Sequence, residues 1–279
     1  LSPLEGDHVL RLTAEGAQVS PELRPSRERD ATSGEMLGTG LPVLDQMLEG
    51  GIARGTVTLL SGPTGVGKST LGMQMLIKAC RNGDRALAVP MEEMEDVLRR
   101  RCRAINLGAD EQIEAGRLKI LGIEPLRYTP QELAAAIISE VDANDISHIL
   151  LDSISGYQQM VKSIESQQAP ISHLHSLCQQ LQDRGVTVLV PSEVRTLTGD
   201  VQVGEIPASY LADNIVLLRY REEAGRLAKT FCVLKKRLGG FDPGLRDFQI
   251  TDDGIQIGDA LHNKQQVLSG QPQVVGEVD

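Results

Sequence analysis

Residues 62–70, GPTGVGKST, constrain the fold of this chain more than any other stretch. An apolar run at residues 57–60 precedes them, and residues 68–81 follow with the apolar spacing of a helix. The stretch fits the pattern Gly-x-x-x-x-Gly-Lys-Ser, in which glycines let consecutive backbone N–H groups point at phosphate oxygens. The pattern requires a strand before it and a helix after it, and both are predicted here. We therefore interpret residues 62–70 as a phosphate-binding loop.

Each part of the phosphate-binding loop has an expected role. The helix that begins at Lys68 adds the positive end of its dipole to the site. Lys68 is expected to reach the β- and γ-phosphates as a catalytic cation, and Ser69 to supply an oxygen to Mg²⁺. The predicted nucleotide-binding residues are Thr64, Gly65, Val66, Gly67, Lys68, Ser69 and Thr70.

Short apolar runs alternate with amphipathic ones along the middle of the chain. Strands are predicted at residues 56–61, 85–89, 118–121, 147–152 and 186–190, and helices at 68–81, 93–104, 130–142 and 171–184. This alternation predicts an α/β fold with a mostly parallel sheet and right-handed crossovers, so that helices cover both faces. Four further strands, at residues 214–220, 228–235, 245–251 and 255–257, predict an antiparallel β-meander that continues one edge of the sheet.

The first 33 residues differ from the rest. Residues 21–30, PELRPSRERD, are polar and contain proline, which indicates a linker. Residues 11–19, RLTAEGAQV, resemble residues 249–257, QITDDGIQI, either by chance or as the remnant of a repeat. We expect residues 1–33 to be the closing strands of a preceding domain plus a linker, 34–260 to be one nucleotide-binding domain, and 261–279 to be a tail.

Charge and cysteine content bound the partners and the compartment. The net charge is −10 and the pI is near 5.1, which argues against a dedicated nucleic-acid binder but allows a local basic strip. The four cysteines are widely spaced and form no zinc pattern, as expected for reduced thiols in a cytoplasmic protein. No window approaches about 18 consecutive apolar residues, so no membrane partner is predicted.

Carboxylates follow two of the predicted strands. Asp152 ends the buried run HILLD, where a carboxylate can orient Mg²⁺ in a nucleotide site. Glu92 and Glu93 lie at a strand-to-helix junction, where one of them can polarise the group that attacks the γ-phosphate. Glu93 is in addition a candidate Mg²⁺ ligand. Acidic residues also stabilise helix N-termini by themselves, and the spacing leaves both interpretations of the glutamate pair open.

Two basic runs have an ordinary and a functional interpretation. Residues 99–103, RRRCR, are typical of a solvated or subunit-facing surface, and a nucleic-acid strip is the alternative. In residues 234–240, LKKRLGG, the side chains of Lys235 and Arg237 project to the same side of a strand. They either reach an anionic group across a subunit boundary or protect an edge strand from unwanted pairing.

Taken together, these residues resemble the KaiC-like branch of the RecA-type ATPases, and specifically the second ATPase domain of a tandem KaiC-like protein. The similarity covers about residues 34–270 and rests on a combination of motifs. The matching stretches are GTGLPVLDQMLEGGIARGTVTLLSGPTGVGKST, MEE, HILLDSIS, PSEVR, ADNIVLLRY and LKKRLGGFDPGLRDFQITDDGIQI.

The resemblance implies a homo-oligomeric ring, commonly a hexamer, with ATP and Mg²⁺ held between subunits. Glu92 and Glu93 match the paired catalytic glutamates of the family. Ser192 and Glu193 fall where the family senses the nucleotide state, and Lys235 and Arg237 match the pair that reaches the neighbour's nucleotide. A KaiB-like or signalling protein is the kind of partner that the resemblance implies.

The resemblance also implies Ser/Thr autokinase activity. Clock members of the family carry adjacent Ser and Thr residues just before the strand that corresponds to residues 214–220. Here the pair is Ser209 and Tyr210, so the serine is retained and the threonine is replaced. The expectation is a single phosphoacceptor, Ser209.

Two other functions are compatible with the same fold. A DNA-dependent motor or recombinase needs a basic loop facing the pore, and residues 195–208 carry one arginine against Asp200 and Glu205. The sequence therefore favours the ATPase over the motor, and no nucleic-acid partner is expected. A nucleotide-gated assembly or signalling module, in which a partner reads the ring, differs from the enzyme mainly in having very slow hydrolysis.

Overall fold

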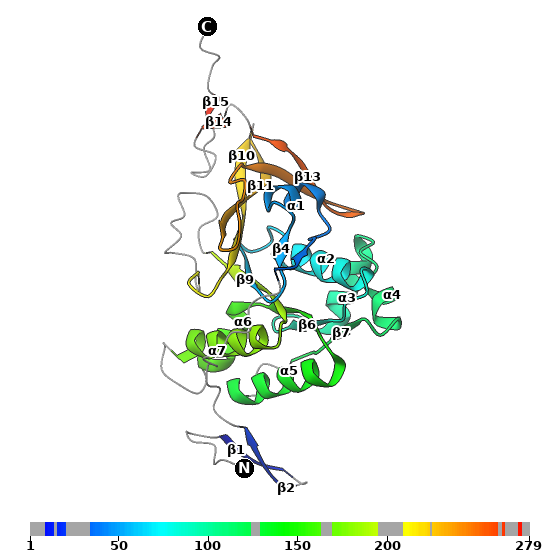
Figure 1. The fold of residues 1–279 in the computed structure, drawn as a ribbon. Coiled ribbons are helices and arrows are strands. Elements are labelled where there is room, and N and C mark those ends of the chain that lie inside the picture. The colour runs from blue at the N-terminus through cyan, green and yellow to red at the C-terminus, as the bar shows by residue number, and fades with distance from the viewer. Residues whose placement is uncertain are drawn as a thin grey trace.

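A nine-stranded sheet forms the centre of the molecule in the computed structural model (Figure 1). The structure describes residues 9–13, 16–20, 34–123, 129–162, 169–194, 209–223, 225–261, 264–265 and 273–274. The strands, in sheet order, are β13 (Gly254–Ala260), β12 (Arg246–Thr251), β11 (Arg226–Lys236), β10 (Asn214–Glu223), β5 (Val57–Gly62), β9 (Thr187–Glu193), β8 (His148–Asp152), β6 (Ala86–Pro90) and β7 (Leu118–Ile120).

The sheet has a parallel part and an antiparallel part. Strands β10, β5, β9, β8, β6 and β7 are parallel to one another, and β11, β12 and β13 continue the β10 edge as an antiparallel meander. Every residue of β5 and β6 is buried, as expected for strands covered on both faces. The predicted α/β fold with a C-terminal meander is confirmed.

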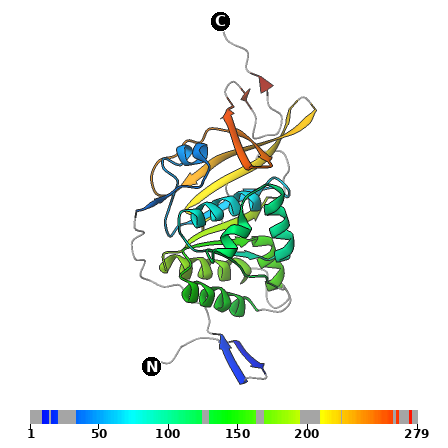
Figure 2. The same ribbon diagram turned by 90° about the vertical axis from the view of Figure 1, so that its right-hand side faces the viewer.

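Helices cover both faces of the parallel part (Figures 1 and 2). Helix α2 (Lys68–Arg81) packs on one face with α3 (Glu95–Ala104), α4 (Ala109–Glu114) and α1 (Pro42–Met47). The other face carries α5 (Pro130–Asn144), α6 (Ile154–Lys162) and α7 (Ala169–Asp183). Each face thus has its own apolar core, and the sheet separates the two.

Several boundaries differ from the sequence prediction. Helix α3 begins at Glu95 rather than at residue 93, so that Glu93 lies in the connection before the helix. Helix α5 begins where predicted, because Thr129 and Glu132 form a capping box around Pro130. Helices α1, α4 and α6 were not predicted, and neither was the short pair β3 (Met36–Leu37) and β4 (Ile52–Ala53).

The two similar nine-residue segments form hairpins of the same register. Strand β1 (Val9–Thr13) pairs with β2 (Gly16–Ser20) so that Thr13 faces Gly16, and β12 pairs with β13 so that Thr251 faces Gly254. Both glycines have positive φ, which suits a tight turn between strands. The division of the chain into domains stays a prediction. The tail region includes the short pair β14 (Lys264–Gln265) and β15 (Gln273–Val274).

The helices in the described part of the chain are all too short or too polar to cross a membrane.

Candidate functional site

The phosphate-binding loop connects the carboxyl end of β5 to the start of α2. Gly67 is the N-cap residue of α2, with φ near +122°, and it offers no side-chain acceptor to the first helical N–H groups. The first turn of α2 contains no acidic residue. These N–H groups are therefore available to an anion, and a phosphate is the ligand that suits them best.

Close packing explains two of the glycines in the loop. A Cβ atom on Gly62 would lie 2.4 Å from the backbone oxygen of Leu218 in β10. A Cβ atom on Gly67 would lie 3.0 Å from Cδ1 of Ile250 in β12. The loop is thus pressed against the meander side of the sheet, which fixes the direction in which its N–H groups point.

Lys68 folds over its own loop. Its Nζ atom donates a hydrogen bond of 2.9 Å to the backbone oxygen of Pro63. Burial lowers the pKa of Lys68, and the nearby carboxylates of Glu193, Asp152 and Glu92 oppose that shift. The lysine therefore sits among acidic groups that come from three other strand ends.

Asp152 lies at the carboxyl end of β8, as the sequence predicted, and it meets the phosphate-binding loop. Burial raises the pKa of Asp152, while a hydrogen bond from the Ser69 side chain and the nearby Arg101 oppose the rise. Ser69 and Asp152, two of the three predicted Mg²⁺ ligands, are therefore near enough for the serine to influence the pKa of the carboxyl. Among the described residues, no group of three or more His, Cys, Asp or Glu side chains has metal-binding geometry. A Mg²⁺ ion bound to a nucleotide usually needs only one or two protein ligands.

Glu92 and Glu93 follow β6, the strand next to β8, and each has its own partner. The Ser153 hydroxyl donates to Oε1 of Glu92. Oε1 of Glu93 forms an ion pair of 2.8 Å with Nη2 of Arg101. Burial raises the pKa of Glu93, Arg101 opposes the rise, and Asp152 and Glu92 add to it. The two glutamates thus lie in different local environments.

The two predicted sensor residues behave differently. Glu193, at the carboxyl end of β9, accepts a hydrogen bond from the Thr64 hydroxyl and so contacts the phosphate-binding loop. Ser192 faces Ser61 in the register between β9 and β5, and both side chains are fully buried. Neither hydroxyl has a hydrogen-bond partner among the described residues.

The remaining loop residues pack against the sheet. The side chains of Val66 and Thr70 are buried, so only the backbone of Val66 can face a ligand. A Cβ atom on Gly65 would lie 3.3 Å from the hydroxyl of Tyr220 in β10. Residues from four adjacent parallel strands and one helix meet at the carboxyl ends of those strands, which is where ligands bind in open α/β folds.

Lys235 and Arg237 lie at the opposite end of the sheet. Asn214 pairs with Lys236 in β11 and with Thr58 in β5, four residues before Gly62. Lys236 lies between the two cations, so its place in the register gives theirs. Four residues at about 3.3 Å each put this position roughly 13 Å from Gly62 along the strands, and β11 is two strands away from β5. They do not contact the phosphate-binding loop of their own chain.

A cation patch forms at that opposite end from Lys235, Arg237 and the segment before β10. Lys235 Nζ donates to the backbone oxygen of Ala212 at 2.6 Å and of Ser209 at 3.4 Å. Arg237 Nη1 lies 2.9 Å from Oδ1 of Asp213. The structure thus brings the predicted phosphoacceptor and the two predicted trans-acting cations together. Residues 195–208, in which a DNA motor would need a basic loop, lie outside the described residues.

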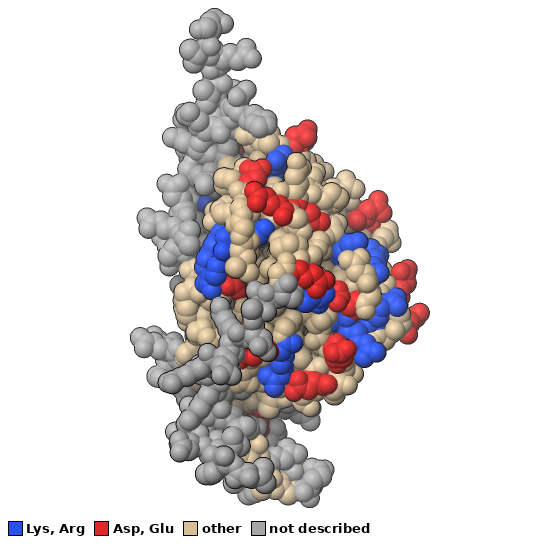
Figure 3. Space-filling view, in the orientation of Figure 1, with Lys and Arg blue, Asp and Glu red and all other residues tan. Residues whose placement is uncertain are grey.

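Basic and acidic side chains lie next to one another over much of the surface in Figure 3, and the arginines of residues 99–103 form ion pairs with nearby acidic residues. Arg99 and Arg103 both pair with Asp110 of α4, and Arg100 pairs with Asp96 one turn earlier. These pairs support the interpretation as a solvated surface over that of a nucleic-acid strip.

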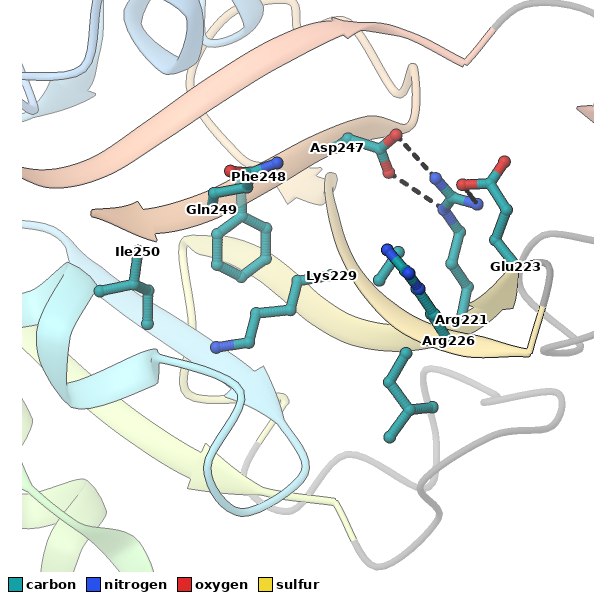
Figure 4. Close-up of a pocket in the computed structure, with 10 residues that line it drawn as sticks. Arg221, Glu223, Arg226, Lys229, Asp247, Phe248, Gln249 and Ile250 are labelled. Atoms are coloured by element: carbon teal, nitrogen blue, oxygen red, sulfur yellow. Dashed lines mark hydrogen bonds and ion pairs between the residues drawn. The ribbon is translucent and has the colours of Figure 1, made fainter.

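Sequence reasoning did not find a groove beside the phosphate-binding loop. This groove, of about 870 Å³, is lined by the meander strands, and Phe248 and Ile250 form its end nearest Gly67 (Figure 4). Lys229 lies in it with Nζ 6.0 Å from the centre of the Tyr220 ring. At its far end the buried Arg221 is held by Asp247 and Glu223. The residues come from three strands, so no local motif signals them.

Comparison with known proteins identifies the family. The family model described as "ATPase: KaiC" matches residues 37–262. The chain belongs to the KaiC ATPase family. The circadian clock oscillator protein KaiC of Acaryochloris marina is 28% identical over 271 residues, which are 97% of this chain and 51% of that protein. KaiC of Synechococcus elongatus is 26% identical over 271 residues, with the same coverage. The chain spans about half the length of the curated relatives it matches, consistent with one half of a KaiC protein. The resemblance found in the sequence is confirmed.

Proposed function

We propose that this chain binds ATP with Mg²⁺ at the phosphate-binding loop and hydrolyses it at the boundary between identical subunits of a ring, commonly a hexamer. The observation that carries the proposal is the meeting of Lys68, Ser69 and Asp152 with the glutamate pair at the uncapped start of α2. A cationic helix start surrounded by carboxylates suits a phosphate chain that arrives together with a divalent cation.

The residues present fit Mg²⁺. The Ser69 hydroxyl and the Asp152 carboxylate are hard oxygen donors that lie near each other, and the Asp152 side chain is partly exposed at the end of β8. When bound, Mg²⁺ supplies positive charge to the β- and γ-phosphate oxygens. Lys68 leaves the Pro63 carbonyl to bind the same phosphates. Because Oε1 of Glu93 is paired with Arg101, we assign the metal to Ser69 and Asp152 rather than to Glu93.

Glu93 is the better candidate for orienting the attacking group. Burial makes it a stronger base than a solvated carboxylate, and Arg101 favours its ionised form. In hydrolysis the water oxygen bonds to the γ-phosphorus, the bond to the ADP oxygen breaks, and Glu93 accepts the water proton. In the autokinase reaction the Ser209 hydroxyl of a neighbouring subunit takes the place of water.

The groove beside Gly67 is the site proposed for the nucleoside. Phe248 and Ile250 offer apolar contact next to the phosphate-binding loop, and Lys229 brings a positive charge. Ile250 and Phe248 line the groove and also lie next to Gly67, so we propose that a nucleotide bound by its phosphates has its base on this side.

The geometry supports assembly from head to tail. Ser209 and the cation patch lie far from the phosphate-binding loop of their own chain, so they can act only on a neighbour's nucleotide. Exposed apolar residues lie beside both ends: Met94, 76% exposed, follows Glu93, and Tyr210, 60% exposed, follows Ser209. A contact between two different surfaces of identical subunits generates a ring when its rotation closes.

Mixing two inactive variants tests the shared site. Lys68→Met removes phosphate binding but keeps the cation patch. Arg237→Ala removes a cation of the patch but keeps the phosphate-binding loop. Each alone is expected to show little hydrolysis. A mixture forms some boundaries with one intact loop and one intact Arg237, so activity returns. A mixture no more active than the average of its parents would show that the site is completed within one chain.

Labelling with γ-labelled ATP tests the autokinase. Ser209→Ala is expected to abolish incorporation, whereas Tyr210→Phe, the matched control, retains it. Unchanged labelling of Ser209→Ala would exclude that serine as the acceptor.

The nucleotide-gated module uses the same site and differs in its output. We propose that a protein partner of KaiB-like or signalling type recognises the assembled ring. Native mass measurement with ATP, with ADP and without nucleotide is expected to show assembly that depends on ATP. Assembly indifferent to nucleotide would reject gating. The paired arginines of residues 99–103 give no support to the DNA motor.

A further inference from the structure

Arg101 is the one arginine of the run at residues 99–103 that pairs with a site carboxylate in the described part of the chain. It lies in the second turn of α3, and its side chain reaches back past the helix start to Glu93. Long helical side chains lean toward the helix N-terminus, which makes this contact possible without distortion. The other arginines of the run pair with Glu95, Asp96 and Asp110, on α3 and α4.

The ion pair is well placed to fix the orientation of Glu93. Nη2 of Arg101 and Oε1 of Glu93 are 2.8 Å apart, and the two side chains are 35% and 20% exposed. By contrast, Arg100 and Asp96 are each 68% exposed, so that pair is largely solvated. Partly buried side chains have fewer alternative rotamers. Nη2 of Arg101 lies outside regular hydrogen-bond geometry among the described residues, so the pair acts through the attraction of opposite charges at short distance.

The backbone alone does not fix the orientation of the Glu93 side chain. It lies in the connection before α3 rather than on the helix, so no regular backbone fixes its position. Lys68, a second cation near the acidic groups, is bonded to the Pro63 carbonyl of its own loop. Glu92 is held separately, by the Ser153 hydroxyl. Arg101 is thus the contact that determines where the Glu93 carboxylate points.

We infer that Arg101 is a positioning residue that holds one oxygen of Glu93, so that the other oxygen faces the water attacking the γ-phosphate. The inference rests on the proposed ATPase function and deepens it. Arg101 touches neither substrate nor reacting atoms, and it acts only through Glu93. Its loss leaves the base present but free to turn away, which lowers the rate of the chemical step and leaves nucleotide binding intact.

A double-mutant cycle in steady-state hydrolysis tests the inference. General-base removal by Glu93→Gln is expected to lower kcat about a hundredfold. Arg101→Ala is expected to lower kcat about tenfold with KM for ATP unchanged within about twofold, and Arg101→Lys to restore part of the loss. In the Glu93→Gln background, Arg101→Ala is expected to have no further effect, because its target is gone. Arg100→Ala is the matched control and keeps the wild-type rate.

Two results would overturn the inference. One is an unchanged kcat in Arg101→Ala. The other is a loss in Arg101→Ala that multiplies fully with that of Glu93→Gln, which would mean that Arg101 acts independently. If Arg101→Ala does not fold, Arg101→Met, which keeps the aliphatic stem, takes its place in the cycle.

Binding of a fluorescent ATP analogue, measured on the same samples, distinguishes failure of the proposed ATPase function from failure of the role inferred for Arg101. Wild-type protein that neither binds nor hydrolyses ATP removes the proposed function and the inference with it. Wild-type protein that binds and hydrolyses ATP while Arg101→Ala matches it removes the inference alone.

Discussion

Arg237 forms an ion pair with Asp213 of its own chain. Replacing each partner separately measures how much the pair contributes to the free energy of unfolding. The Asp213 side chain is only 5% exposed, and that of Arg237 is 42% exposed. Oδ2 of Asp213 accepts hydrogen bonds from the backbone N–H of Val57, at 3.0 Å, and from Nε2 of Gln182, at 2.9 Å. Arg237 occupies the other oxygen, at 2.9 Å. The carboxylate is therefore a buried junction, and the arginine is its solvent-facing partner.

The structure predicts unequal costs for the two substitutions. Arg237→Ala removes a half-exposed partner and leaves the buried carboxylate with two neutral hydrogen bonds, so the free energy of unfolding should fall by about 1–2 kcal/mol, between the values for exposed and buried pairs. Asp213→Asn keeps the shape, but all three partners are donors and the new amide nitrogen must face one of them. Two charge-assisted hydrogen bonds are each weakened by about 1 kcal/mol and the third contact is lost. The free energy of unfolding should therefore fall by roughly 2–3 kcal/mol.

Urea unfolding of dilute, nucleotide-free protein at neutral pH checks both values. The difference between the two variants matters for function, because an arginine held by only about 1–2 kcal/mol can leave Asp213 for a neighbour's phosphate. Should Arg237→Ala destabilise the chain as much as Asp213→Asn, the arginine is a structural partner of Asp213, and its proposed role at the neighbouring site is refuted.

Two further predictions concern pH and the phosphate-binding loop. Burial lowers the pKa of His148 from 6.5 to about 4, so the unfolded chain takes up a proton first and stability falls as pH drops from 6.5 towards 4. Between pH 7 and pH 5, His148 should lower the free energy of unfolding by about 2 kcal/mol. Urea unfolding of His148→Gln should lack this part of the pH dependence. An identical pH dependence in the wild type and the variant would contradict the prediction. Gly62→Ala places a Cβ atom 2.4 Å from the Leu218 oxygen, so we expect a loss of about 1–3 kcal/mol in stability and at least about tenfold weaker ATP binding. Gly122→Ala, where nothing lies within 4 Å, is the control, and equal ATP affinity in the two variants would refute the packing argument.

The layered fold could be predicted because its signals are local. Buried parallel strands have continuous apolar runs, and the long helices have clear periodicity and, in α5, a capping box. Helix α4 has only six residues and so carries little periodicity. Helix α6 contains Gly156, which weakens a helix prediction. In the structure a Cβ there would lie 2.8 Å from Cβ of Met91, so tertiary packing requires the glycine.

Some parts of the candidate site could also be predicted from the sequence, and others could not. The phosphate-binding loop and Asp152 could be placed from sequence, because a strand end is a position that the chain itself defines. The pairing of Arg101 with Glu93 could not, because the same basic run also forms ordinary surface ion pairs. The contact between Thr64 and Glu193, and the groove at Phe248, depend on strand order, which brings together residues far apart in the chain.

Equilibrium binding of ATP with Mg²⁺, measured by titration calorimetry on aggregate-free protein, tests whether residues 62–70 bind the nucleotide. We predict saturable binding of one ATP per chain with a dissociation constant at or below about 1 mM, weakened at least tenfold in Lys68→Ala. No heat of binding with ATP at millimolar concentration, or equal affinity in Lys68→Ala, would contradict the assignment of residues 62–70 as the nucleotide site.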